Sequence, residues 1–364
     1  MRIQDEKSRE WRKMMELKER LTVVAPTKDN VNLTVVQEVG VKPPFASQPC
    51  VCGNQRGIYV GGLVTDSFVP CIVSYRSRQP DSNCEVIEPF GSVVQAIAAI
   101  GNYLYVGDGS AIAEDCIHVT QKAILRCITA TCDVETLSIT DSRAISLPCG
   151  GLTCIQYQPS TRRLLTGSTD GIVCVLSLEC PESPNFASHF QVQLPESRSV
   201  ASMAFCGSVV AVGLSSPFVL LHAIESGTCV NELSGQHGDV LCLCSDETAA
   251  HDSDSSLQGK GGSLLYSGAS DGSIKVWRME TFRPVGSMLE QRGRLTVLAY
   301  LSKMQWLVAG GQDGMLRVWD RSYKCIFRNA LFPAAICALS VTGTSNLLAM
   351  DVNGTIKSIS LSPE

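Results

Sequence analysis

The sequence predicts an all-β protein assembled from a hairpin that repeats about every 40 to 45 residues. Near-copies of one segment occupy residues 165–176, 266–277, 308–320 and 348–359. Each copy holds an Asp-Gly or Asn-Gly pair, which supplies the positive-φ positions of a tight turn between two strands. The run after each turn alternates between apolar and polar residues, as a half-buried strand does. The turn residues Asp271 and Asp313 lie 42 positions apart, a spacing typical of repeat architectures.

The ends of two copies carry a more specific signal. The third copy ends in the pair Trp319-Asp320, and the second keeps Trp277 at the same position. Together with the Asp-Gly turns, these endings resemble the WD-repeat family, whose members are β-propellers of four-stranded blades. The resemblance implies a buried network in each blade between a Ser or Thr, the turn Asp, the Trp and a His of the loop that enters the blade. The residues expected to hold the turns, rather than to act in catalysis, are Thr166, Asp170, His237, Ser267, Asp271, Trp277, Asp313, Trp319 and Asn353.

Weaker copies of the repeat bring the expected count to seven blades between residues 33 and 362. The last blade shows only three strands, whereas residues 32–39 alternate like a strand ahead of the first blade. We therefore predict a seven-bladed β-propeller of antiparallel blades, spanning residues 31–364 and closed by this N-terminal strand, which joins the last blade. Closure of that kind removes the exposed sheet edges that favour aggregation.

Residues 1–30 differ from the predicted ring because they are rich in charge and contain no Gly. Met14, Leu17 and Leu21 recur at i, i+3 and i+7, which is the spacing of one helix face. We predict a short charged helix, which lies against the propeller or frays, or else docks on a partner or in a short coiled coil. The candidate docking side chains are Trp11, Met14, Met15, Leu17 and Leu21.

Residues 245–262 form a polar, acidic insertion between the first two strands of the fifth blade. Low complexity of this kind predicts a flexible segment. Ser253, Ser255 and Ser256 are candidates for phosphorylation, which would add negative charge to that face. A tolerated surface insertion without a role of its own is the alternative.

Composition narrows the expected partners. The net charge is −5, which disfavours a surface that neutralises nucleic-acid phosphates.

The 17 cysteines are odd in number and lie mostly within predicted strands, so we expect buried free thiols in a reducing compartment rather than disulfides. Neither the cysteine spacings nor the five isolated histidines fit a zinc site, and no metal or other cofactor is expected.

No catalytic motif is recognisable in the sequence, such as a Gly-x-Ser-x-Gly elbow or a Walker loop. We therefore expect a non-enzymatic scaffold or adaptor subunit that binds other proteins of a larger complex through loops held on a rigid ring. The resemblance implies docking on the face that bears the interblade loops. The candidate contact residues on that face are Phe90, Arg198, His237, Arg292, Arg294, Gln312 and Phe332.

Two other functions are kept as alternatives. Substrate receptors of cullin-type ubiquitin ligases often carry Trp-Asp-x-Arg at the end of a blade, and this chain has Trp319-Asp320-Arg321. An RNA-associated propeller is the second alternative.

Because no apolar run reaches about 18 residues, we predict no membrane insertion. The charged N-terminal stretch does not resemble a secretory signal. We expect a cytoplasmic protein without homo-oligomers, with the nucleus or a cytoskeletal or ciliary structure as alternative locations.

Overall fold

The computed structural model describes residues 31–40, 50–53, 57–63, 70–76, 85–87, 94–108, 123–132, 137–180, 184–192, 199–246, 263–289, 293–342 and 345–363. The predicted N-terminal helix, with its docking residues Trp11, Met14, Met15, Leu17 and Leu21, lies outside these ranges. Most of the acidic insertion and three predicted contact residues (Phe90, Arg198 and Arg292) also lie outside them.

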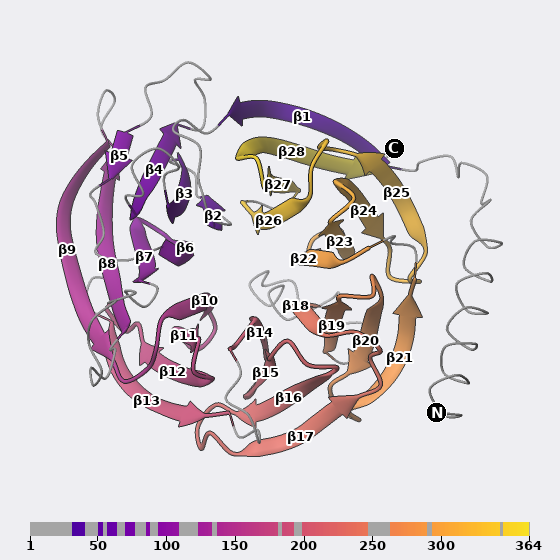
Figure 1. Cartoon of the computed structure of the whole chain (residues 1–364), viewed down its shortest axis with the longest axis horizontal. Coiled ribbons are helices and arrows are strands. Elements are labelled where there is room, and N and C mark those ends of the chain that lie inside the picture. Colours follow the sequence, from indigo (N-terminus) through magenta and orange to yellow (C-terminus); the bar gives the residue numbers. More distant parts are fainter. Residues whose placement is uncertain are drawn as a thin grey trace, which may run out of the picture.

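The described elements are all strands, and they form seven separate four-stranded antiparallel sheets arranged around a centre (Figure 1). In the first six sheets the strands follow each other in sequence order from the centre to the rim. The prediction of a seven-bladed β-propeller is therefore confirmed. We number the blades along the chain, so that blade 1 begins at β2 and blade 7 at β26.

Blades 1 to 3 consist of the strands β2 (Cys50–Gly53), β3 (Gly57–Leu63), β4 (Pro70–Arg76) and β5 (Glu85–Ile87); β6 (Val94–Ile100), β7 (Tyr103–Asp108), β8 (Ala123–Cys132) and β9 (Leu137–Leu147); and β10 (Leu152–Gln158), β11 (Arg163–Ser168), β12 (Ile172–Ser177) and β13 (Asn185–Gln191). Blades 4 and 5 consist of β14 (Ser202–Cys206), β15 (Val209–Gly213), β16 (Phe218–Ala223) and β17 (Cys229–Ser234); and β18 (Val240–Ser245), β19 (Leu264–Ala269), β20 (Ile274–Arg278) and β21 (Arg283–Met288). Blades 6 and 7 consist of β22 (Leu295–Leu301), β23 (Trp306–Gly311), β24 (Met315–Trp319) and β25 (Cys325–Ala330); and β26 (Ile336–Val341), β27 (Asn346–Asp351), β28 (Thr355–Pro363) and β1 (Val31–Gly40).

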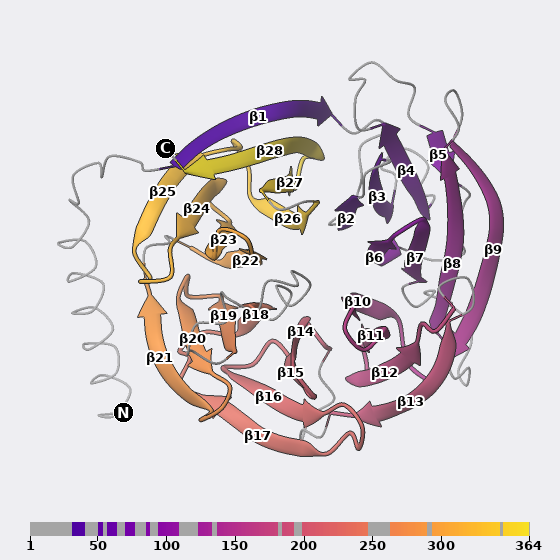
Figure 2. The same ribbon diagram turned by 180° about the vertical axis from the view of Figure 1, so that it is seen from behind.

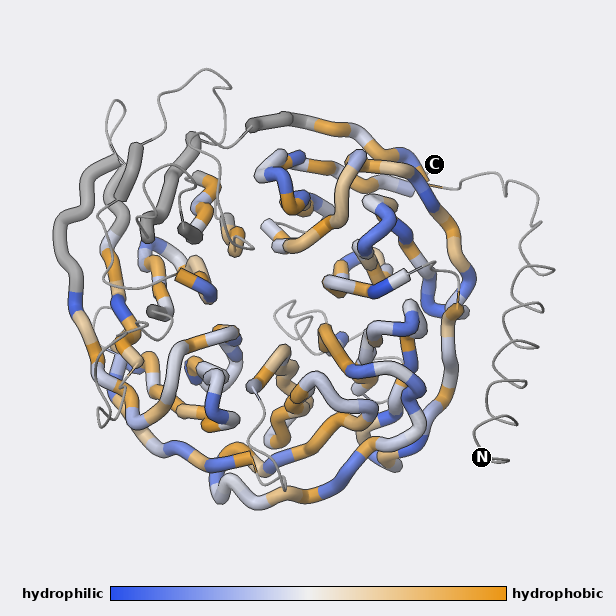
Figure 3. The backbone as a smooth tube through the Cα atoms, in the orientation of Figure 1, coloured by the Kyte–Doolittle hydropathy of each residue, from blue (hydrophilic) through white to orange (hydrophobic). Residues whose placement is uncertain are grey.

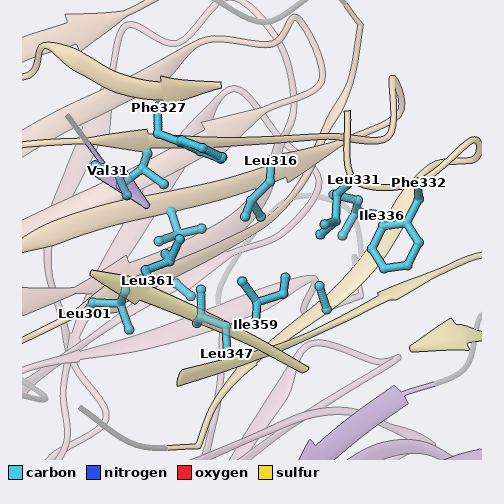
Figure 4. Packing of buried hydrophobic residues seen from close by; sticks show 14 residues of the cluster. Val31, Leu301, Leu316, Phe327, Leu331, Phe332, Ile336, Leu347, Ile359 and Leu361 are labelled. Atoms are coloured by element: carbon cyan, nitrogen blue, oxygen red, sulfur yellow. The ribbon is translucent and has the colours of Figure 1, made fainter. Parts of the chain in front are cut away.

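The two ends of the described chain close the ring together. β1 is the outermost strand of blade 7 and pairs antiparallel with β28, from Val31 opposite Pro363 to Gly40 opposite Thr355 (Figures 1 and 2). Val31 is 3% exposed and packs in one apolar cluster with Ile359 and Leu361 (Figure 4). The predicted closing strand is therefore confirmed, and the seam is held by buried side chains as well as by backbone pairing.

Glycines on the second strands allow neighbouring blades to approach closely. A Cβ added at Gly61 would lie 2.5 Å from Val94, which begins the innermost strand of the next blade. The same contact recurs between Gly310 and Ile336 at 2.8 Å. In blade 7 the position is taken by the buried Met350, which packs in one apolar cluster with residues of blade 1. The seam that joins the last blade to the first is therefore packed differently from the others.

A β-bulge interrupts the two outermost strands at the same place in four successive blades. The register shifts fall between Val175 and Leu176, Leu221 and His222, Val276 and Trp277, and Val318 and Trp319. The rim strands β17 and β21 carry both hydrophobic and hydrophilic residues (Figure 3). Bulges make an edge a poor template for another strand, so the rim of these blades is unsuited to pairing with a partner's strand.

Candidate partner-binding face

One face of the ring carries the turns between the second and third strands of each blade, together with the loops that enter each blade. We call this the turn face; its described turns lie at residues 169–171, 214–217, 270–272, 312–314 and 352–354. Gly171, Gly272, Gly314 and Gly354 all have positive φ, as the predicted Asp-Gly and Asn-Gly turns require. The opposite face carries the remaining hairpin turns of each blade, because the strands of a blade run antiparallel.

The turn face is tied together by one repeated backbone hydrogen bond. In blades 3, 5, 6 and 7, the residue before the turn Asp or Asn donates its N–H to the carbonyl of the residue that precedes the innermost strand. These bonds join Thr169 to Gly151 (2.8 Å), Ser270 to Asp239 (2.8 Å), Gln312 to Arg294 (3.0 Å) and Val352 to Ala335 (2.9 Å). Each entering loop is therefore fixed to the turn of its own blade.

Blade 5 contains a buried side-chain network, but its loop member is not the predicted His237. The Trp277 Nε1 group donates to the Ser267 Oγ atom at 2.8 Å, and the Ser267 hydroxyl donates to Gln236 Oε1 at 2.7 Å. Gln236 Nε2 in turn donates to the Ser267 carbonyl at 2.9 Å. Gln236 is 6% exposed, whereas His237 is exposed. The prediction for His237 is wrong, because the amide of Gln236 occupies the buried position.

The carboxylate of Asp271 in the turn of blade 5 accepts hydrogen bonds from a residue of the same turn. Asp271 Oδ1 accepts hydrogen bonds from the backbone N–H of Ser273 at 2.9 Å and from its hydroxyl at 2.6 Å. Such an Asp-mediated turn fixes the two residues that follow without any partner from another blade. The prediction that Asp271 holds its turn is consistent with these bonds.

Blade 3 uses a different hydroxyl from the predicted one. Asp170 accepts hydrogen bonds from the Gly150 N–H at 2.8 Å and from the Ser168 hydroxyl at 2.5 Å. The side chain of Thr166 is fully buried and has no hydrogen-bond partner among the described residues. The hydroxyl that supports the turn is therefore that of Ser168. The prediction for Thr166 is wrong, because Leu176 stands where Trp277 stands in blade 5 and offers no indole N–H to this hydroxyl.

Blade 6 replaces the serine-centred network with an ion pair. The carboxylate of Asp313 accepts two hydrogen bonds from the Arg317 guanidinium, at 2.5 and 3.2 Å. Ala309 stands where Ser267 stands in blade 5, and the buried Trp319 Nε1 group has no hydrogen-bond partner among the described residues. Asp313 therefore holds the turn as predicted, while Trp319 contributes only apolar packing.

In blade 7 the structural carboxylate precedes the turn. Asp351 is fully buried, and its Oδ1 atom accepts from the backbone N–H groups of Asn353 at 3.1 Å and Thr355 at 2.7 Å. The side chain of Asn353 is exposed. Asn353 thus serves the turn through its backbone, and Asp351 is the residue that sequence reasoning missed.

Two lysines form hydrogen bonds to backbone carbonyls of the loops that enter blades 5 and 7. The Lys275 ammonium donates to the Gly235 carbonyl and lies 5.8 Å from the centre of the Trp277 ring. Lys357 Nζ donates to the Leu331 carbonyl at 3.0 Å. The two lysines occupy the same position, two residues before the Trp277 site of their blades. The alternation of residues along the third strand could have predicted that both lysines point to the same face of their sheets. It could not have predicted which backbone carbonyls they bind.

The structure divides the predicted contact residues. His237, Arg294 and Gln312 are exposed on the turn face. Phe332 is only 4% exposed and belongs to the apolar cluster between blades 6 and 7, with Lys357 Nζ 5.1 Å from its ring centre (Figure 4). The prediction of Phe332 as an exposed contact is wrong. The backbone N–H groups of Leu331 and Phe332 both bind the Gly314 carbonyl, which draws the ring inward.

Metal binding and thiol reactivity depend on how side chains are grouped and buried. The described residues contain no group of three His, Cys, Asp or Glu side chains placed to hold a metal ion. Burial raises the pKa of the Cys154 thiol to about 11 and that of the Cys337 thiol to about 12, so both stay protonated near neutral pH. Within the described ranges, no helix is long and apolar enough to cross a membrane.

Comparison with known proteins agrees with this geometry. The family model for the WD domain, G-beta repeat, matches residues 145–177, 227–278 and 283–320. The second match runs from just before β17 to the end of β20, and the third from the start of β21 to just after β24. Three regions of the chain therefore carry WD repeats, and its seven four-stranded sheets are consistent with a WD-repeat β-propeller. WD repeats generally form scaffolds for protein–protein interaction, and their presence indicates such a role in general terms.

Two curated proteins resemble parts of this WD-repeat chain. A CCR4-associated factor 4 homolog from the yeast Vanderwaltozyma polyspora is 27% identical over 97 residues, which are 26% of this chain and 13% of the relative. The sterol regulatory element-binding protein cleavage-activating protein of Xenopus laevis is 23% identical over 252 residues, which are 65% of this chain and 17% of the relative. The WD-repeat chain thus corresponds to a small part of each relative's length.

Proposed function

We propose that this WD-repeat protein is a non-enzymatic adaptor that holds a partner protein on its turn face within a larger assembly. The observation that carries the proposal is the hydrogen bond that fixes each entering loop to its turn in four blades. A surface fixed in this way loses little conformational entropy on binding. The exposed side chains of His237, Arg294 and Gln312 stand on these fixed loops and turns.

Two further observations favour the turn face over the rim. The bulged outermost strands are unsuited to strand addition, so docking falls to the loops. Arginine is also among the residues that contribute most at protein interfaces. The names of both relatives refer to other proteins, CCR4 and a sterol regulatory element-binding protein. Those names support a role that operates through a partner.

The proposal includes a reducing, intracellular location. The thirteen cysteines with described side chains are free thiols, of which six are buried, five half-buried and two exposed. The ubiquitin-ligase alternative gains no support from Asp320. Its Oδ1 atom accepts from Ser322 N–H (2.9 Å), Ser322 Oγ (2.6 Å) and Lys324 N–H (3.0 Å), all within its own turn.

Affinity purification with lysine crosslinking tests the adaptor role. We expect crosslinks from Lys275 and Lys357, near the turn face, to one recurrent partner. The variant Arg294→Glu with Gln312→Ala should lose that partner, because it reverses a charge and removes an amide on the docking surface. Its melting temperature should stay close to that of the natural protein, since both side chains are exposed.

The matched control is Lys303→Glu, an exposed charge reversal on the opposite face. This control should retain the partner. Equal capture by the Arg294→Glu, Gln312→Ala variant and the natural protein would contradict the proposal.

A further inference from the structure

A cluster of positive charge lies on the opposite face of the ring, away from the turn face. It comprises Arg278 and Arg283, which flank the outer hairpin turn of blade 5, and Arg321 and Lys324 in the corresponding turn of blade 6. All four side chains are exposed. We call these four residues the basic patch.

The charges of the basic patch are not neutralised by the described part of the chain. Arg278 and Arg283 are register partners on β20 and β21, so two like charges stand directly opposite each other. The ion pairs of the described residues join Arg163 to Glu225 and Arg317 to Asp313, and neither involves the patch. Such an arrangement costs stability unless another group compensates it.

Acidic residues near the patch compensate it only in part. Asp320 directs its Oδ1 atom to three donors of its own turn. Glu280 is exposed, between the two arginines of blade 5, and forms no ion pair with a described residue. Asp246 lies near enough to Arg321 for this arginine to oppose the rise that burial causes in the pKa of Asp246, but the carboxylate also accepts from the Leu264 N–H at 2.8 Å and the Ser263 hydroxyl at 3.4 Å. The two turns thus keep excess positive charge in a chain whose net charge is −5.

Tyr323 joins the two halves of the patch. Its ring lies against the outermost strand of blade 5, since a Cβ added at Gly286 would lie 2.9 Å from it. Tyr323 has φ of 63°, a left-handed conformation that is unfavourable for a non-glycine residue. The corresponding turn position in blade 4 is Gly227, with φ of 67°. Blade 6 therefore keeps a tyrosine at a position where blade 4 has the unstrained glycine.

The electrostatics of Tyr323 agree with this geometry. Burial raises the pKa of its hydroxyl, and Asp246 acts in the same direction, while Arg278 and Arg321 both oppose the rise. Arginines from two different blades therefore act on one phenolic oxygen. A negatively charged group near this hydroxyl would meet donors from both blades.

We propose that the basic patch is a second docking surface, which binds an acidic segment, rich in Asp and Glu, of a protein partner. Carboxylates of such a segment would pair with the four exposed cations and relieve the repulsion between Arg278 and Arg283. The turn face would remain free, so one ring could hold two partners at once.

Fluorescence anisotropy with a labelled peptide of alternating Glu and Ala tests the proposal on the full chain. The peptide should bind the natural protein, and the same peptide with Lys in place of Glu should not. Arg321→Glu with Lys324→Glu should weaken binding by about tenfold or more, as should Arg278→Glu with Arg283→Glu. Binding should also weaken as salt is raised, because the pairs are exposed.

The matched control is Arg294→Glu with Arg328→Glu, which makes the same change in charge at two exposed arginines outside the patch. This control should bind the peptide like the natural protein, and far-ultraviolet circular dichroism should show that all variants are folded. If the control variant bound the acidic peptide as weakly as the patch variants do, net charge alone would explain the loss of binding, and the proposal would be overturned. Binding of phosphatidylserine vesicles, but not of the acidic peptide, would overturn it as well.

Discussion

Gln236 shows how a single buried amide can replace the residue expected from the family resemblance. It connects the loop that enters blade 5 to Trp277 through the hydroxyl of Ser267. An amide supplies both a donor and an acceptor, and here Ser267 uses both of them. Its neighbour His237 is exposed and so remains available to a partner. Of these two adjacent residues, Gln236 is therefore structural, and His237 is a candidate contact for a partner.

Gln236→Ala should lower the free energy of unfolding by about 1–3 kcal/mol, because it leaves the buried Ser267 hydroxyl and carbonyl without their partner. Thermal or urea unfolding followed by circular dichroism measures the loss. His237→Ala is the matched control and should change stability by less than about 0.5 kcal/mol. If the two variants lost the same stability, the network assigned to Gln236 would be wrong.

The thiols should differ sharply in their reactivity. Near neutral pH, iodoacetamide should label the exposed Cys180 and Cys229 in the folded protein and spare Cys154, whose pKa is raised to about 11 by burial. Mass spectrometry of the digested protein locates the labels. Unfolding in urea should make Cys154 react as well. Fast labelling of Cys154 in the folded protein would contradict the packing of blade 3.

At the scale of elements, the repeated hairpins were predictable because Asp-Gly spacing and strand alternation are local properties. The side chains that hold the turns were less predictable. Ser168 and Asp351 sit at the same place at the end of the second strand, where blade 5 has Ala269 and blade 6 has Gly311. Each blade therefore satisfies its turn with a different polar group, and a single family pattern cannot identify all of them.

The contact between blades sets a limit on side-chain size at the second strand. A Cβ at position 167 would lie 2.6 Å from Val200 Cγ1 and 2.7 Å from Cys154 Sγ, whereas a Cβ at position 213 would lie 3.1 Å from its nearest neighbour, Val240 Cγ1. Gly167→Ala should therefore cost about 1–3 kcal/mol of stability, and Gly213→Ala clearly less.

Unfolding midpoints of these two glycine variants give the comparison. Adding Val200→Ala to Gly167→Ala should cost less than the sum of the two single changes, because the second substitution removes the colliding methyl groups. Equal losses for the two glycine variants, or strict additivity of the pair, would show that the spacing between blades does not depend on these contacts.

At the scale of the whole molecule, the ring depends on one pairing between distant parts of the chain. The alternation of residues 32–39 was enough to predict that pairing, but not the buried contact of Val31 with the side chains of blades 6 and 7. The exposure of individual loop residues was also beyond sequence reasoning. Phe332 was expected on the surface, but its ring packs in the apolar cluster of blades 6 and 7 while its backbone is fixed to Gly314.

Removal of residues 31–40 should destabilise the whole ring rather than one strand. It leaves β28 as an open edge and exposes the cluster around Leu361, and burial of Val31 alone is worth about 1.5–3 kcal/mol. We expect a lower and broader thermal transition. Thr34→Ala, at an exposed position of β1, should melt like the natural protein. A synthetic peptide of residues 31–40, added in excess, should restore part of the lost stability by refilling the edge of blade 7. A truncated chain that melted like the intact one would mean that the seam between β1 and β28 does not hold the ring closed.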